Sequence, residues 1–277
     1  QQWRLNGAIT NADAQDRWML TTPVSYPADG TAMNTLRKSA ANIRLGEYIA
    51  DATAESIARY GLDTPRLVIR LHQAAGTIGA VGTTGSYATT DYPEATITLV
   101  IGEQESDLVD YVLYDGGIYR CSTLLLRGVM NADWQETITR YPVLTALGNL
   151  ASLSRETANG VDTWVITRTE QVAENNELVT DDEGNQVYDI TLMKNGESAD
   201  YTAFSAAYNQ LMMVTMSGRL PDGWTAADAP HTVWTFTDVD GTVHTVALTR
   251  YDAMHDAVAV DGVALFYLIQ GGFSLGI

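Results

Sequence analysis

The chain has 277 residues, enough for two domains of ordinary size, and 45% of them are hydrophobic, so it is expected to fold around real cores rather than to stay disordered. Acidic residues outnumber basic ones by 34 to 16, and the net charge of −18 disfavours binding to nucleic acid or to anionic lipid surfaces. The chain has one cysteine, which excludes an internal disulfide, and no run of about 18 apolar residues that could span a membrane.

Near the N-terminus, residues 3–9 and 18–22 predict a pair of strands joined through the polar segment 11–16. The chain opens almost directly on the first strand, as a processed or truncated product would. Pro23 and Pro27 are then expected to end the extended structure before the first helix.

Residues 18–45 read as a strand, a proline-containing turn and an amphipathic helix. Asp29 suits the N-cap of that helix, because its carboxylate can accept hydrogen bonds from the first free backbone N–H groups. Apolar residues follow the cap at four intervals that share one helical stripe: Met33, Leu36, Ala40 and Ile43. The same design returns in residues 187–214, where Asp200 is the cap and the stripe is Phe204, Ala207, Leu211 and Val214.

Each of these helices is followed by two predicted β-hairpins. The strands are 67–71, 96–101, 111–114 and 118–121 in the first half, and 232–236, 243–248, 257–260 and 263–269 in the second. Asp115-Gly116 and Asp261-Gly262 predict tight turns, since glycine tolerates the positive φ that such turns need. The order of helix, hairpin and hairpin therefore occurs twice; chance similarity between two amphipathic helices is the alternative reading.

We therefore predict an α+β fold made of two tandem related repeats, residues 1–145 and 146–277. Each repeat is expected to be a mainly antiparallel β-sheet with one principal amphipathic helix. Residues 54–60 predict a short second helix that stops at Gly61, and residues 163–170 predict a strand. Two further segments are expected to be helical or irregular connectors between the repeats, 124–134 and 144–153.

The first predicted hairpin differs between the two halves. In the second half it closes through residues 238–241, whereas in the first half it contains residues 73–95, which are rich in glycine, threonine and alanine. The first repeat thus has an insertion at a hairpin tip. A loop of that length is either functional or only mobile, and both readings stay open.

The histidines and the cysteine do not form a recognisable metal site. His231 and His244 lie on one predicted hairpin, with His244 facing Thr237, so the two rings are expected about 20 Å apart. The other histidines, His72 and His255, lie in separate segments, and the acidic turn within residues 175–185 lacks the ligand spacing of a calcium loop. We expect no metal site.

No motif of nucleophilic catalysis, phosphate binding or dinucleotide binding is present. Cys121 lies in a predicted strand and is expected to be a small core residue rather than a nucleophile. Tryptophans in predicted strands, including Trp18, Trp164 and Trp234, are expected in the core rather than on a sugar-binding surface. The sequence therefore predicts no catalytic residue, no cofactor-binding residue and no cofactor.

Four segments resemble a bacterial family, the domain of unknown function 4340. They are a W-x-L strand at 18–20, a P-V-x-Y-P-A-D turn at 23–29, a Y-G-L-D-x-P segment at 60–65 and a V-G-E strand at 101–103, where Ile101 replaces the valine. The resemblance covers residues 16–135 well and residues 146–277 more loosely. It implies an extracytoplasmic protein of the bacterial envelope, usually behind an N-terminal membrane anchor that is absent from this chain, with some members accompanying ABC transport systems of the gliding-motility type.

Two functions follow as expectations. The first is a non-enzymatic binding or scaffolding module of the cell envelope, with an unidentified protein partner that belongs to a membrane transport system. The alternative is an envelope hydrolase or carbohydrate-active enzyme, in which two carboxylates would converge about 5 to 10 Å apart in a cleft between the repeats.

Overall fold

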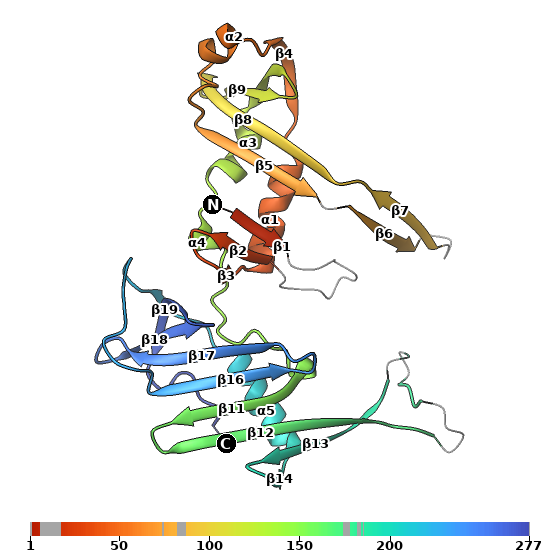
Figure 1. The fold of residues 1–277 in the computed structure, drawn as a ribbon, viewed down its shortest axis with the longest axis vertical. Helices are drawn as coiled ribbons and strands as arrows, with labels where there is room; N and C mark the ends of the chain where they lie inside the picture. Colours follow the sequence, from red (N-terminus) through yellow and green to blue (C-terminus); the bar gives the residue numbers. More distant parts are fainter. Residues whose placement is uncertain are drawn as a thin grey trace. The chain divides into compact units, whose positions relative to one another are not determined.

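The computed structural model describes residues 2–5, 18–73, 75–81, 87–173, 178–181, 184 and 186–276 (Figure 1). The chain divides into two compact units, residues 1–138 and 139–277. With 19% helix and 48% strand in several antiparallel sheets, the predicted α+β class is confirmed. Among the described residues, no helix combines the length and the apolar character needed to cross a bilayer.

Within its described residues, the first unit contains antiparallel sheets and four helices. A three-stranded sheet has the order β1-β2-β3, and the main sheet has the order β4-β10-β9-β8-β5. The strands are β1 Gln2–Leu5, β2 Trp18–Thr22, β3 Tyr26–Pro27, β4 Leu45–Asp51, β5 Leu67–Gln73, β6 Gly76–Val81, β7 Tyr87–Tyr92, β8 Ala95–Ser106, β9 Val109–Tyr114 and β10 Gly117–Ser122. The helices are α1 Gly30–Ala41, α2 Ala54–Arg59, α3 Thr123–Met130 and α4 Trp134–Thr137.

These elements confirm most of the predictions for the first half. β1 pairs with β2, although residues 6–9 of the predicted first strand lie outside the described residues. β9 and β10 form a hairpin through Asp115 and Gly116, both at positive φ. The insertion forms a further two-stranded ladder, β6 with β7, of which residues 74 and 82–86 lie outside the described part.

Helix α1 begins at the predicted aspartate cap, but its apolar stripe is only partly buried. The Asp29 carboxylate accepts a hydrogen bond from the Ala32 N–H at 2.8 Å, which satisfies a free donor of the first turn. Met33 is buried, but Leu36 and Ala40 are only half-buried. The helix ends at Ala41, so Ile43 is half-buried beyond its end rather than on its stripe. The apolar spacing predicts stripes that are buried along their whole length, and this prediction is wrong for both principal helices. In α5 (Tyr201–Met212), Phe204 and Leu211 are buried, whereas Ala207 and Val214 are half-buried and Val214 lies beyond the end of the helix.

The core of the first unit lies between the main sheet and α3. It contains buried residues of β5, β8, β9, β10 and α3, namely Ile69, Leu99, Ile101, Val112, Cys121 and Leu126. Cys121 is 2% exposed, and burial raises the pKa of its thiol to about 11. A thiol held protonated in this way packs as a small apolar side chain, which confirms its predicted core position.

The second unit has one nine-stranded sheet, with the order β14-β13-β12-β11-β16-β17-β18-β19-β15, and one long helix. The strands are β11 Leu150–Thr157, β12 Gly160–Glu170, β13 Tyr188–Lys194, β14 Glu197–Ala199, β15 Gly218–Arg219, β16 Thr232–Asp238, β17 Val243–Arg250, β18 His255–Val260 and β19 Val263–Ile269. The helices are α5 Tyr201–Met212 and the single-turn 3₁₀ helix η1 Leu147–Asn149.

The prediction of a helical or irregular connector at residues 144–153 is wrong for the second half of that segment. Residues 150–153 belong to β11, which pairs with both β12 and β16 and so lies inside the sheet. Leu150 and Leu153 are both buried although three positions separate them, a spacing that suits a helix better than a strand. The register of β11 shifts between Leu150 and Ser152, and such a bulge adds one residue to the alternation. The other connector is helical, as α3 and α4.

Helix α5 is packed on an aromatic core. The Asp200 carboxylate caps it by accepting hydrogen bonds from the N–H groups of Thr202 and Ala203. Fully buried rings of the helix, Phe204 and Tyr208, contact fully buried rings of the sheet: Trp164, Trp234 and Phe236. The predicted core positions of Trp164 and Trp234 are confirmed, and each ring removes a large apolar area from water. Trp18 of β2 is only half-buried, so the prediction is wrong for this tryptophan.

The order of connections after the principal helix is the same in both units. In the first unit, β4 follows α1 and pairs with β10, the last strand of the antiparallel series β5, β8, β9 and β10. In the second unit, β15 follows the helix α5 and pairs with β19, the last strand of the series β16, β17, β18 and β19. The surroundings differ, because β11 joins the second series to the strands before α5.

Candidate functional site

The two segments that resemble family motifs lie against each other in the first unit. Gly61 ends α2 at a φ of +64°, and a Cβ on it would lie 2.4 Å from Cγ of Glu103. A Cβ on Gly102 would lie 2.3 Å from the carbonyl oxygen of Tyr60. The Glu103 N–H donates to that same oxygen at 2.9 Å. Both glycines are therefore needed for the close approach of the two backbones.

Arg66 connects these segments to a buried carboxylate. Its Nε donates to the carbonyl oxygen of Gly102 at 2.7 Å, and its Nη2 forms an ion pair with Oδ1 of Asp110. The other oxygen, Oδ2 of Asp110, accepts a hydrogen bond from Oγ1 of Thr123 at 2.7 Å. Asp110 is fully buried. A buried carboxylate is tolerated because both of its oxygens have partners and one partner is a cation.

Thr123 is the first residue of α3 and ties this helix to the β8–β9 turn. Its N–H donates to the carbonyl oxygen of Leu108 at 2.9 Å. Gln104 lies opposite Asp110, and the register of β8 with β9 shifts on both sides of Gln104. Such irregularities redirect side chains at the end of a strand. The end of β8, the β8–β9 turn and the first residue of α3 are thus held together.

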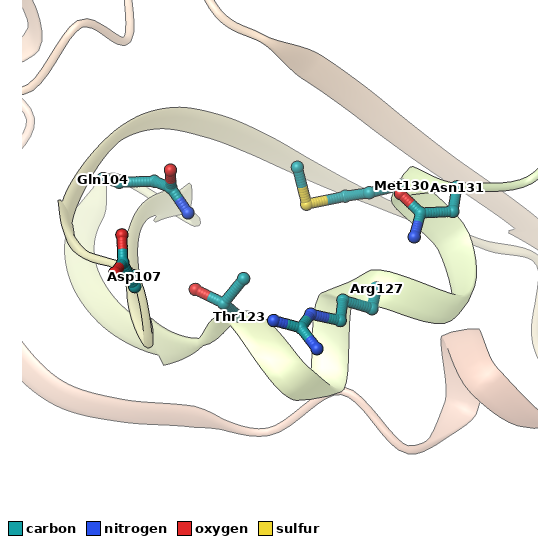
Figure 2. Close-up of a pocket in the computed structure, with 6 residues that line it drawn as sticks. All are labelled: Gln104, Asp107, Thr123, Arg127, Met130 and Asn131. Carbon is teal, nitrogen blue, oxygen red and sulfur yellow. The ribbon is translucent and has the colours of Figure 1, made fainter.

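These elements surround a depression of about 460 Å³, which we call the α3 pocket. Figure 2 shows its lining as a ring of side chains around an open centre: Gln104, Asp107, Thr123, Arg127, Met130 and Asn131. The lining offers one guanidinium, one carboxylate, two amides, one hydroxyl and one thioether. Such a set can orient a polar ligand by hydrogen bonds and one charge contact.

The pocket is better suited to binding than to nucleophilic attack. Thr123 is 7% exposed, and its hydroxyl proton is donated to Asp110. That carboxylate also pairs with Arg66, so the hydroxyl is held in a fixed contact, and the described lining of the pocket offers no histidine beside it to act as a base. The Thr123 oxygen therefore remains an acceptor and a wall of the pocket.

Residues 18–232 match the family described as Domain of unknown function (DUF4340). The chain belongs to this family. No curated protein and no solved structure matches the chain. The DUF4340 match includes both motif segments and the α3 pocket, crosses the boundary between the two units, and ends at the first residue of β16.

The histidines of this DUF4340 chain each face a different carboxylate. His244 Nδ1 lies 2.9 Å from Oδ2 of Asp261, and this hydrogen bond raises the pKa of His244 despite its partial burial. The remaining contacts are His231 with Asp256 at 3.2 Å, His255 with Asp252 at 2.9 Å and His72 with Glu94 at 4.0 Å. Within the described residues, no three His, Cys, Asp or Glu side chains converge as they would around a metal ion.

The predicted register of the second-unit hairpin is off by one residue. His244 lies opposite Phe236, and Thr237 lies opposite Val243. The connection is longer than a two-residue turn on Asp240 and Gly241, because the Asp238 N–H donates to the carbonyl oxygen of Thr242. Within the acidic segment 175–185, residues 175–177, 182, 183 and 185 lie outside the described part of the chain, and the predicted absence of a calcium site stays a prediction.

Sequence reasoning missed the residues that build the α3 pocket. Asp110 had a visible signal, because it stands two positions before Val112 in an otherwise apolar and aromatic strand and so points to the same face as this core residue. Arg66 directly follows the Y-G-L-D-x-P segment. Arg127 and Asn131 gave no signal, since exposed polar residues at the end of a helix are common. The hydrolase alternative, with carboxylates between the repeats, stays a prediction.

Proposed function

We propose that this DUF4340 chain is a non-enzymatic binding or scaffolding module of the bacterial cell envelope, which holds a segment of a partner protein in the α3 pocket. The full-length protein would be extracytoplasmic, anchored by an N-terminal membrane segment, and accessory to an ABC-type transport system. The family resemblance supports the location and the transport association, and the pocket supports the binding role.

The observation that carries the binding role is the way the α3 pocket is built. The motif segments, Arg66 and the buried Asp110 are all used in contacts that hold the pocket walls. The residues that face the open centre are mostly exposed side chains with donor and acceptor groups, including the guanidinium of Arg127. A rigid frame beneath adaptable polar groups is the arrangement expected of a recognition site.

We further propose that the two units arose by duplication of one α+β repeat, so that the module presents two related surfaces. The shared cap, helix length and order of connections support this proposal. An experimental structure tests it: the backbones of α1 with β5, β8, β9 and β10 should superpose on α5 with β16, β17, β18 and β19. Opposite helix placement on the two sheets would contradict it.

The binding role is tested by affinity purification of the full-length protein from its native envelope. We expect an envelope protein to co-purify with the parent chain and to be lost with Arg127→Glu, because among the described residues that line the pocket the guanidinium of Arg127 is the one cation. Arg59→Glu is the matched control, since Arg59 is also exposed and near the end of a short helix of the first unit. Equal recovery of the partner with both variants would contradict the role of the pocket.

A further inference from the structure

Strand β5 forms one border of the main sheet of the first unit, where it pairs only with β8. Among the described residues, no backbone hydrogen bond outside that ladder involves residues 67–73. Alternate N–H and C=O groups of β5 therefore point away from the sheet without a ladder partner, as they do at any border that can accept another strand. In the second unit, the border strands β14 and β15 have only three and two residues.

An apolar groove of about 300 Å³ adjoins this border on the helix side of the sheet. Leu71 of β5 lies opposite Ile97 of β8, and both line the groove together with Ala40, Ala41 and Tyr114. Leu71 is 37% exposed and Ile97 is 41% exposed, which is unusual for large apolar residues on the face that holds the core. Small alanines at the end of α1 leave the groove open, since a larger side chain there would fill it.

Basic side chains lie on β5 and at the groove, because Arg70 belongs to β5 and Arg44 lines the groove. Residues 30–46 contain Arg37, Lys38 and Arg44 and no acidic residue, although the whole chain has a net charge of −18. Arg70 is exposed on the opposite face of β5 from Leu71. Glu94 lies 4.0 Å from His72, near the far end of the strand. An acidic segment would find complementary charge here.

We propose that β5 and the adjoining groove form a strand-addition site for an extended acidic segment of a partner protein. Its backbone would pair with β5, its apolar side chains would alternate into the groove beside Leu71, and its carboxylates would face Arg70. An exposed arginine alone is a common protection of a sheet border, but it does not require an open apolar groove beside it. A second copy of this chain fits poorly, because antiparallel pairing of two β5 strands would bring their Arg70 side chains together. The inference rests on the proposed protein-binding function and names the class of segment that is bound.

The test is a fluorescence anisotropy titration of the full chain with a labelled peptide of alternating valine and glutamate. We expect binding to the parent, and at least about tenfold weaker binding to Arg70→Glu and to Ala40→Leu, which places a larger side chain in the groove. Arg127→Glu should bind as the parent does, because Arg127 lines the α3 pocket instead. A peptide of alternating valine and lysine should not bind.

Backbone methylation distinguishes strand addition from simple charge attraction. Two peptides methylated on alternate amides, in opposite phase, should differ: one phase removes the donors that face β5 and should abolish binding, while the other should bind as before. Hydrogen exchange of amides in residues 67–73 should slow on binding. Absence of binding to the parent, equal binding of the lysine peptide, or equal effects of both methylation phases would overturn the proposal. Such a failure would leave the proposed function intact if co-purification still depends on Arg127.

Discussion

The principal helices α1 and α5 have the same length and the same aspartate cap, yet they are covered to very different degrees. Both have 12 residues, but α5 buries Phe204, Tyr208 and Leu211, whereas α1 buries only Met33. At the third position of the stripe, α5 has Leu211 and α1 has Ala40, which lines the open groove. The comparison teaches that one helix design can close a core in one unit and leave a surface open in the other.

The sheets of the two units also differ, because the first unit leaves longer strands at its borders. In the second unit, every long strand has neighbours on both sides, while the border strands β14 and β15 are very short. In the first unit, β4 and β5 each have seven residues and lie at the borders of the main sheet. We therefore expect the second unit to contribute chiefly stability and the first unit to contribute the binding surfaces.

The largest effect should come from removing Arg66. Arg66→Ala leaves the buried Asp110 without its cation, and breaking a buried pair from one side costs about 3–5 kcal/mol in the free energy of unfolding. Arg120→Ala is the matched control, because Arg120 also contacts carboxylates, Glu47 and Glu105, but at an exposed site. Chemical denaturation should show a large loss for the first variant and almost none for the second. Equal losses would show that burial of Asp110 is not what makes Arg66 necessary.

A second prediction compares two substitutions at the third position of the apolar stripe, Leu211→Ala in α5 and Ala40→Leu in α1. Leu211→Ala opens a cavity in the core of the second unit and should cost about 2–5 kcal/mol. Ala40→Leu places the added side chain in an open groove, so it should change stability by less than about 1 kcal/mol. Denaturation curves of both variants measure the difference. A loss of stability with Ala40→Leu as large as that with Leu211→Ala would mean that the groove is closed in solution.

A third prediction concerns the crossing of α1 and α3. A Cβ on Gly128 would lie 2.5 Å from Oγ and 2.7 Å from Cβ of Ser39, so the two helices meet where one has no side chain. Gly128→Ala should cost about 1–3 kcal/mol through overpacking. Ser39→Gly in the same chain should recover most of the loss, because it removes both clashing atoms. If the double variant is no more stable than Gly128→Ala, the clash is not the cause.

A fourth prediction uses pH to probe the second unit. The hydrogen bond with Asp261 raises the pKa of His244 above its ordinary value of 6.5, with smaller contributions from Asp238 and Asp240. Since the pKa is raised in the folded state, the stabilisation is complete below the ordinary pKa and is lost as pH rises through the folded value. The Tm difference between the parent and His244→Gln should thus be larger at about pH 5.5 than at about pH 8.5. The trend should disappear when the same comparison is made in the Asp261→Asn background, and a trend that persists there would contradict the role of Asp261.

The smallest effect is expected from the insertion. Gln73 lies opposite Ala95, so replacing residues 74–94 by Asp-Gly gives β5 and β8 a two-residue hairpin without changing their register. The Tm should stay within a few degrees, because the described side chains of this segment are mostly exposed and their removal leaves the core intact. A collapse of stability, measured by thermal unfolding, would show that residues 74–94 pack as part of the first unit.

The sequence predicted local structure well because local signals specify it. Aspartate caps, Asp-Gly turns and alternating apolar runs each act within a few residues, and they located both helices and the hairpins that follow them. Bulges were invisible, since one extra residue in β11 changes the alternation without changing composition. Arg66, Asp110 and Thr123 come together only through tertiary contacts across three segments, so no local pattern could reveal the α3 pocket.

The most direct test of the division between the two units is site-specific photo-crosslinking in the native envelope. A photoreactive residue would replace Asn131 of the α3 pocket or Leu71 in the first unit, and Val161 or Met254, which are 56% and 66% exposed, in the second. We expect the two first-unit positions to give the same cross-linked partner and the two second-unit positions to give none. Partner adducts from the second-unit positions alone, at equal protein levels, would contradict the assignment of binding to the first unit.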